Sequence, residues 1–305
     1  MSSVIIENIT KTYEKGIVKA LDNVSFEVKS GELFGLIGAD GAGKTTLFRI
    51  LTTLLIPDSG KATVAGFDVI KDLKQIRQIV GYMPGKFSLY QDLSIEENLN
   101  FFATVFGTTV EENFELIRDI YVQIEPFKKR LAGKLSGGMK QKLALCCALI
   151  HEPKVLFLDE PTTGVDPVSR KEFWEMLGRL KERGITIIVS TPYMDEAKLC
   201  DRIALIQNSK ILDVDTLEGI LTKNKQNLFA VSSDNMYQLL KDLRAYTDAV
   251  SCFAFGQHHH LQVKTPTSSD EKLRAYLAHR NHTNVSIETI NPDIEDTFIK
   301  LMQDA

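Results

Sequence analysis

The chain has 305 residues, 44% of them hydrophobic and 25% charged, and its formal net charge at pH 7 is -4. This length predicts about two domains, and the composition is typical of a globular protein. The net charge argues against a general basic surface for nucleic acid or anionic lipid, so no nucleic-acid partner is expected.

The sequence also lacks the signals of a membrane or secreted protein. Its longest apolar runs, such as residues 143–150, are far shorter than the roughly 20 residues that a bilayer requires. The first residues, MSSVIIENITKTYEK, do not place an apolar core behind a positive flank, so no secretory signal is expected. Cys146, Cys147, Cys200 and Cys252 have no metal-binding or redox spacing and are interpreted as reduced thiols.

Residues 1–216 alternate buried strands with helices, which predicts an α/β domain with a mostly parallel sheet. The expected elements, in chain order, are edge strands at 4–11 and 24–29, a buried strand at 33–37, a helix from 44 to about 54, a strand at 61–66, a helix at 137–150, a buried strand at 155–158, a helix at 169–183 and a buried strand at 185–190. The stretch from 85 to about 134 predicts an all-helical insertion, in which Ser94 and Glu97 form a capping box. The helical subdomain is expected to span about 85–150.

The composition changes after residue 216, and residues 217–305 predict a small α+β domain. The expected elements are a strand at 228–232, a helix at 236–246, a hairpin at 250–255 and 261–264, a helix at 270–280, a strand at 285–289 and a helix at 294–302. This βαββαβα order is typical of a ferredoxin-like fold. Since this domain carries no catalytic constellation, we expect it to be accessory or regulatory.

Residues 38–45, GADGAGKT, fit the pattern G-x-x-x-x-G-K-[ST] between a buried strand and a helix. In such a loop, glycines let successive backbone N–H groups surround phosphate oxygens, and the helix N-terminus adds partial positive charge. Lys44 would place its ammonium between the β- and γ-phosphates of ATP, and Thr45 would offer its hydroxyl to Mg²⁺. The nucleotide-binding residues predicted here are Gly38, Asp40, Gly41, Ala42, Gly43, Lys44, Thr45 and Thr46.

A second motif, VLFLDE, ends an apolar strand with Asp159 and Glu160. The strand would deliver Asp159 to the Mg²⁺ shell, directly or through water. Glu160 would then orient or deprotonate the attacking water as the catalytic residue. This motif is a weak signal alone and becomes strong beside the phosphate loop.

The run LSGGM at 135–139 makes the interpretation specific, because it resembles the LSGGQ signature of the ABC ATPase family. Met139 replaces the usual Gln, while the residues that make the phosphate contacts are kept. The resemblance implies that Ser136, Gly137 and Gly138 act on the γ-phosphate held by an opposite subunit, at a helix N-terminus. The alternative is that this run only begins a helix capped by Ser136 and has no role in binding a nucleotide.

The resemblance covers about residues 3–222 and is closest to ATPases of ABC-2-type drug exporters, with their GxDGAGKTTL, LSGGMKQK and LDEPTTGVDP runs. It implies that Tyr13 stacks on adenine, worth roughly 1–3 kcal/mol, and that Asp166 lies in a loop crossing the subunit boundary. The implied partners are integral membrane permease subunits and a second ABC ATPase domain, in a homo- or heterodimer. The implied location is cytoplasmic, at the inner face of the plasma membrane through the permease.

Two positions depart from the family pattern. Gly85 follows the run YMP where the family has Gln, and Pro192 follows the run VST where the family has His. That Gln normally contacts Mg²⁺ and water, that His contacts the γ-phosphate, and loss of one preorganised donor typically costs about 10²–10³ in rate. We hypothesise that the site built on Lys44 and Glu160 binds ATP but hydrolyses it slowly. The alternative is that Lys86, Tyr193 or water substitutes and turnover is normal.

Two other functions compete with a transporter motor. A non-transport ABC protein is disfavoured by the single nucleotide domain and by the lack of a basic surface signal, whereas Gly85 and Pro192 keep open a regulatory module with negligible turnover. The remaining polar clusters are interpreted as solvated: the histidines at 258–260, the acidic pair at 111–112 and the basic run at 128–130.

Overall fold

Strands without a polar face form the middle of a six-stranded sheet. Every residue of β3 (Leu33–Ile37), β7 (Val155–Asp159) and β8 (Thr186–Thr191) is buried in the computed structural model, which describes residues 1–225, 227–264 and 270–304. The order is β10-β9-β3-β8-β7-β6, with β6 at Val80–Met83, β9 at Arg202–Gln207 and β10 at Lys210–Asp215. All neighbouring strands are parallel except β9 and β10, which pair antiparallel. These two strands were not among the elements predicted from the sequence. Since β3, β7 and β8 run parallel, the loops after them meet at one edge of the sheet.

The amino-terminal strands form a separate antiparallel sheet of order β2-β1-β4-β5. Its strands are β1 (Ser2–Tyr13), β2 (Val18–Lys29), β4 (Ser59–Val64) and β5 (Phe67–Asp68). The prediction of an edge strand was wrong for β1, because β2 and β4 pair with it on its two sides. Register shifts between β1 and β2 interrupt the period of two, so the alternation revealed only part of each strand.

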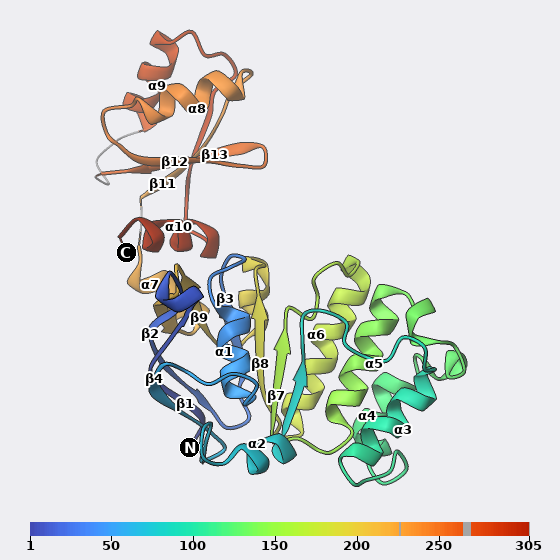
Figure 1. The fold of residues 1–305 in the computed structure, drawn as a ribbon. Coiled ribbons are helices and arrows are strands. Elements are labelled where there is room, and N and C mark those ends of the chain that lie inside the picture. Colours follow the sequence, from blue (N-terminus) through green and yellow to red (C-terminus); the bar gives the residue numbers. More distant parts are fainter. Residues whose placement is uncertain (226, 265–269, 305) are drawn as a thin grey trace. The chain divides into compact units, whose positions relative to one another are not determined.

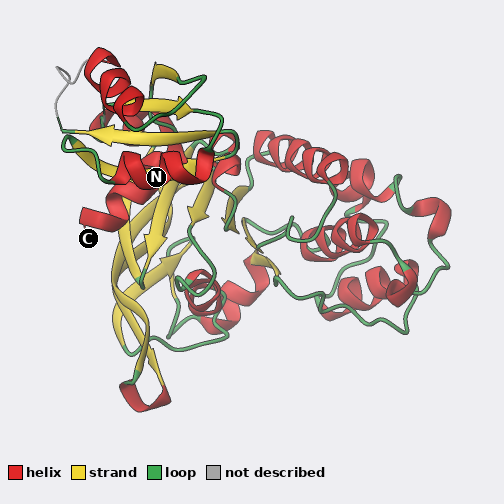
Figure 2. Ribbon diagram, turned by 90° about the horizontal axis from the view of Figure 1, so that it is seen from above, coloured by secondary structure: helices red, strands yellow, loops and turns green. Residues whose placement is uncertain are grey.

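Helices flank these sheets and also form a lobe of their own within the unit Met1–Leu217. The flanking helices are α1 (Lys44–Leu51), α2 (Leu73–Ile79) and α6 (Pro167–Glu182), and the lobe contains α3 (Ile95–Val105), α4 (Phe114–Tyr121) and α5 (Gly137–Leu149). Figure 2 shows this lobe gathered to one side of the strands. Ser94 begins α3 with the predicted capping box: its Oγ accepts from the Glu97 N–H at 3.2 Å, and the Glu97 carboxylate accepts from the Ser94 N–H at 2.7 Å. None of the helices among the described residues combines the length and the apolar composition that a membrane span requires.

The second unit, Glu218–Ala305, has a sheet of order β12-β13-β11-β14 with all neighbours antiparallel. Its elements are β11 (Leu228–Ser232), α8 (Met236–Arg244), β12 (Ala249–Phe255), β13 (His258–Val263), α9 (Asp270–His279), β14 (Ser286–Ile290) and α10 (Ile294–Asp304). Figure 1 shows α8 and α9 on one face of this sheet and α10 on the other. The order places the fourth strand beside the first, as in a ferredoxin-like fold. The helix α7 (Leu217–Lys223) precedes these elements.

The prediction that the three histidines are solvated was wrong for His259 and His260. The turn between β12 and β13 is shorter than expected, so the histidines begin β13 and point to alternate faces of the sheet. His259 is 5% exposed, and its Nε2 is 2.8 Å from the Met236 carbonyl oxygen. His260 lies 2.8 Å from the Asp296 carboxylate and stacks on Phe255, while His258 is exposed as predicted.

Candidate functional site

The loop between β3 and α1 has a backbone that requires glycine at two points. Gly43 has a φ of +112°, and a Cβ there would clash with the carbonyl oxygen of Ala20. A Cβ at Gly38 would clash with the carbonyl oxygen of Ile206. Gly41 has a φ of +79° and faces open space. Among the described residues, no side chain caps α1 at Gly43, so the first N–H groups of that helix can bind an anion.

Lys44 lies at the centre of this loop and is only 3% exposed. Its Nζ donates to the carbonyl oxygens of Gly38 at 2.9 Å and Ala39 at 3.1 Å. The same nitrogen is 3.1 Å from the carboxylate of Glu160, the predicted catalytic residue, and 3.9 Å from that of the exposed Asp40. The fold therefore brings Lys44 and Glu160 together, and their ion pair is shorter than the one between Lys44 and Asp40.

Thr45 and Asp159 provide the oxygen ligands that a divalent metal would need. The Thr45 hydroxyl donates to Asp159 Oδ2 at 2.8 Å, and Asp159 is 2% exposed. Hydroxyl and carboxylate oxygens at the mouth of a phosphate-binding loop are the donors that Mg²⁺ prefers, so the residues fit the predicted metal. Burial and the negative charge of Asp159 raise the pKa of Tyr82 to about 12, which keeps the Tyr82 phenol protonated.

Glu160 has an uncommon backbone conformation, with a φ of +50°. A residue other than glycine in this left-handed region carries strain and persists only when its surroundings hold it. Here the holding contacts come from Ser190, whose carbonyl oxygen and Oγ both accept from the Glu160 N–H, at 3.0 and 3.1 Å. The strain is located at the residue whose carboxylate reaches Lys44.

Tyr13 lies at the end of β1, beside the same loop. Its hydroxyl is 3.3 Å from the hydroxyl of Thr46, and the residue is 37% exposed, so part of its ring can accept a flat ligand. Ala42 is buried within the loop. The predicted residues from β1, the loop and β7 thus form one cluster.

The signature residues form a second group, at the start of α5. The Ser136 hydroxyl caps that helix by accepting from the Met139 N–H at 3.3 Å, and Ser136 is exposed. A Cβ at Gly138 would press on the hydroxyl of Ser169, in the first turn of α6. Asp166 caps α6 by accepting from the Val168 and Ser169 N–H groups, and the hydrogen bond from Ser169 helps to lower the pKa of its carboxyl. In the described residues, no hydrogen bond joins Ser136 to the cluster around Lys44.

The two departures from the family pattern lie close to this cluster in different ways. A Cβ at Gly85 would be 3.0 Å from the carbonyl oxygen of Asp159 and 3.8 Å from its Oδ2. Pro192 directly follows β8, and the next residue, Tyr193, lies under the guanidinium of Arg170 at 4.4 Å. The Tyr193 ring therefore packs against Arg170, which is not one of the residues clustered around Lys44.

Two residues near the site gave no usable signal in the sequence. Ser190 is fully buried and contacts both Asp159 and Glu160. Glu196 is also fully buried, and its Oε1 accepts from Thr162, Arg170 and Trp174 at 2.7 to 2.8 Å. Ser190 is the next-to-last residue of β8, and only the register of the sheet reveals that it lies beside Asp159.

Comparison with known proteins agrees with this geometry. The family described as ABC transporter matches residues 21–163. The doxorubicin resistance ATP-binding protein DrrA of Mycobacterium tuberculosis is 36% identical over 269 residues, which cover 87% of this chain and 80% of that protein. The chain belongs to the ABC transporter ATP-binding family.

Other relatives of this ABC transporter ATP-binding protein extend the comparison. The linearmycin resistance ATP-binding protein LnrL of Bacillus subtilis is 33% identical, covering 97% of this chain and 96% of that protein. The probable multidrug ABC transporter ATP-binding protein YbhF of Escherichia coli is 40% identical over 280 residues, and the chain spans 48% of its length, about half. An ATP-binding cassette solved as a dimer with ADP and Pi is 26% identical with a TM-score of 0.63, covering 70% of this chain and 98% of that one.

Proposed function

We propose that this chain is the ATP-hydrolysing motor subunit of an ABC exporter, working with a separate membrane permease. The observation that carries the proposal is the cluster of Lys44, Thr45, Asp159 and Glu160, in which residues more than 110 positions apart contact one another. The relatives named for drug export and drug resistance support the direction of transport.

The proposed roles follow from the chemistry of each group. Lys44 and the N–H groups of the loop bind the phosphates of ATP, and Tyr13 stacks on the adenine. Glu160 takes a proton from the attacking water. When bound by Thr45 and Asp159, Mg²⁺ would neutralise charge on the phosphates.

A second ATPase domain is the proposed partner for the signature residues. Ser136 is exposed and Gly137 starts a helix, so this group can contact a phosphate held by another subunit. Head-to-tail pairing would then complete each site with residues from both subunits. The solved relative described as a dimeric ATP-binding cassette supports the pairing of two such domains.

The permease is proposed to contact a hollow between the parallel sheet and the helical lobe. This hollow has a volume of about 370 Å³, and exposed apolar side chains of Leu54, Val105 and Phe106 line it. Apolar surface that remains exposed in this way is typical of a protein contact site. The chain would therefore be held at the inner face of the plasma membrane through the permease.

The chain's own site is proposed to turn ATP over slowly, because Gly85 and Pro192 supply no side-chain donor. The test is ATP hydrolysis by the purified chain, alone and with its natural partner. We expect the purified chain to hydrolyse ATP slowly by itself and the complex with its partner to hydrolyse it faster. Brisk hydrolysis by the chain alone that is abolished in Glu160→Gln would contradict the weak site, and absence of turnover in every complex would favour a regulatory module instead.

The unit Glu218–Ala305 is proposed to serve dimer contacts or regulation. It has its own apolar core, which includes Phe229, Leu239, Leu261 and Leu277. If the chain without residues 217–305 assembles and hydrolyses ATP like the full chain, this role is excluded.

A further inference from the structure

Ser190 occupies the one position of β8 that touches both carboxylate-bearing residues at the end of β7. The two strands are parallel, and Asp159 is the register partner of Ser190. Ser190 is completely buried, and its Oγ donates to Asp159 Oδ1 at 2.6 Å. The same oxygen accepts from the Glu160 N–H at 3.1 Å.

These contacts divide the Asp159 carboxylate between two tasks. Its Oδ1 is occupied by the Ser190 hydroxyl, while its Oδ2 accepts from Thr45 and faces the proposed metal position. A carboxylate held at one oxygen cannot rotate freely about its last bond, so the other oxygen keeps its direction. Partners that hold a metal ligand in this way typically change metal affinity or activity by about 10–100-fold when they are removed.

The second contact acts on the strained backbone of Glu160. Its φ of +50° must be maintained for the carboxylate to reach Lys44 at 3.1 Å. The Glu160 N–H is shared between the carbonyl oxygen and the hydroxyl of Ser190. Both acceptors come from one residue, so Ser190 fixes the backbone from which the Glu160 side chain extends.

We propose that Ser190 is a positioning residue for ATP hydrolysis, which aims the metal-facing oxygen of Asp159 and holds Glu160 in its left-handed conformation. The proposal rests on the ATPase function proposed above. Since Pro192, just after β8, has no side-chain donor that could steady Glu160, Ser190 near the end of that strand carries this task.

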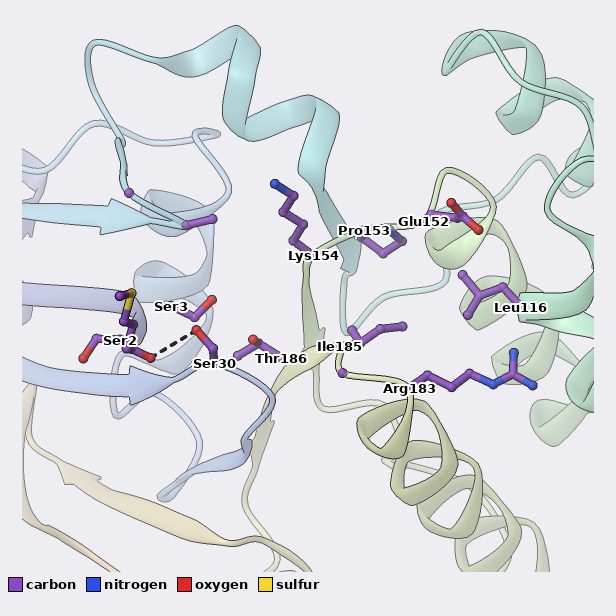
Figure 3. Close-up of a pocket in the computed structure, with 14 residues that line it drawn as sticks. Ser2, Ser3, Ser30, Leu116, Glu152, Pro153, Lys154, Arg183, Ile185 and Thr186 are labelled. Carbon is purple, nitrogen blue, oxygen red and sulfur yellow. Dashed lines mark hydrogen bonds between the residues drawn. The ribbon is translucent and has the colours of Figure 1, made fainter.

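Thr186 offers a matched control in the same strand. It is 2% exposed, and its hydroxyl accepts from the Gly31 N–H at 3.0 Å, so it is also a buried hydroxyl that satisfies a backbone donor. It lies at the other end of β8, where it lines a hollow of about 680 Å³ (Figure 3). The variants Ser190→Ala and Thr186→Val each remove one buried hydroxyl, but only the first removes it beside the carboxylates.

The experiment compares Ser190→Ala, Ser190→Thr and Thr186→Val in the full chain, alone and assembled with its partner. Three quantities are measured: the melting temperature, kcat and KM for ATP, and the affinity for a fluorescent ATP analogue in EDTA and along a Mg²⁺ titration. For Ser190→Ala we expect kcat to fall about 10- to 100-fold with KM changed less than about threefold. We expect the Mg²⁺ concentration for half-maximal enhancement of binding to rise about tenfold, with the affinity in EDTA unchanged.

Ser190→Thr restores a hydroxyl and should recover most of kcat and of the Mg²⁺ dependence of binding. Thr186→Val should lower the melting temperature and leave kcat and the Mg²⁺ dependence unchanged. The proposal is overturned if Ser190→Ala matches Thr186→Val in kcat and in Mg²⁺ dependence. It is also overturned if Ser190→Ala weakens binding equally in EDTA, which indicates general damage. If the wild-type complex shows no turnover that depends on Glu160, the proposed ATPase function fails, and the Mg²⁺ titration, which needs no turnover, still decides the role of Ser190.

Discussion

Replacing Gly85 with glutamine should accelerate ATP turnover at the site built on Lys44 and Glu160. The Cβ position at residue 85 lies 3.8 Å from Asp159 Oδ2, so a side chain starting there reaches the proposed metal and water positions. Gly85 does not have a left-handed backbone, so a side chain is permitted. A single preorganised donor is worth about 10²–10³ in rate.

Two features reduce the expected gain. The same Cβ would be 3.0 Å from the Asp159 carbonyl oxygen, so the loop must shift by a few tenths of an ångström. Pro192 also leaves the second donor missing, and donors that act together are not additive. We therefore expect kcat to rise at least about tenfold, a gain of about 1.4 kcal/mol in transition-state stabilisation.

Steady-state hydrolysis by the assembled complex provides the assay, and Gly85→Ala provides the control. Alanine introduces the same crowding against Asp159 without an amide, so the ratio of the two variants isolates the donor. If Gly85→Gln is no faster than Gly85→Ala while both bind ATP normally, the missing donor is not what limits this site. A wild-type rate already in the ordinary range for the family would refute the same reasoning.

Three further predictions concern other residues. Tyr13→Ala should weaken ATP binding by roughly 1–3 kcal/mol in fluorescence titrations, while Tyr13→Phe, which keeps the ring, should bind normally; equal loss in both would exclude stacking. Glu196→Ala should destabilise the chain by about 1–3 kcal/mol in urea unfolding, because it leaves the buried hydroxyl of Thr162 and the indole N–H of Trp174 without their acceptor. Arg170 keeps its ion pair with Asp195, so a loss below about 0.5 kcal/mol, which is ordinary for a surface substitution, would contradict this. Burial opposes ionisation of Asp242, but hydrogen bonds from His282 and a neighbouring amide outweigh it and lower the Asp242 pKa below its ordinary 3.8. A lowered folded-state pKa gives stability that is present above pH 3.8 and lost as the pH falls further, so Asp242→Asn should flatten the acid end of the stability profile of the second unit.

The chemistry of the site could be predicted where it depends on residues adjacent in sequence. The phosphate loop needs glycines at fixed spacing, and Gly43 confirms why, since no other residue fits against the Ala20 carbonyl. The mostly parallel sheet was predictable because its strands are apolar on both faces. The capping box at Ser94 was predictable because its two partners, Ser94 and Glu97, are only three residues apart in the sequence.

Contacts that depend on strand register could not be predicted. Nothing in the strand 185–190 indicates that its last residue pairs with Asp159, because the register is fixed by packing over the whole sheet. The burial of His259 was missed since it depends on a turn of two residues between β12 and β13. In both cases a shift of one residue would turn the side chain to the opposite face.

The ion pair between Lys44 and Glu160 would couple the affinity for ATP to the availability of Glu160 as a base. In the proposed function, a phosphate group that binds Lys44 would compete with the Glu160 carboxylate 3.1 Å away, so the measured ATP affinity would include the free energy of breaking this contact. The nucleotide would thereby free the side chain of Glu160, so the proposed base would become available only once the substrate has bound. Weakening the pair would then tighten ATP binding while removing this built-in order of events.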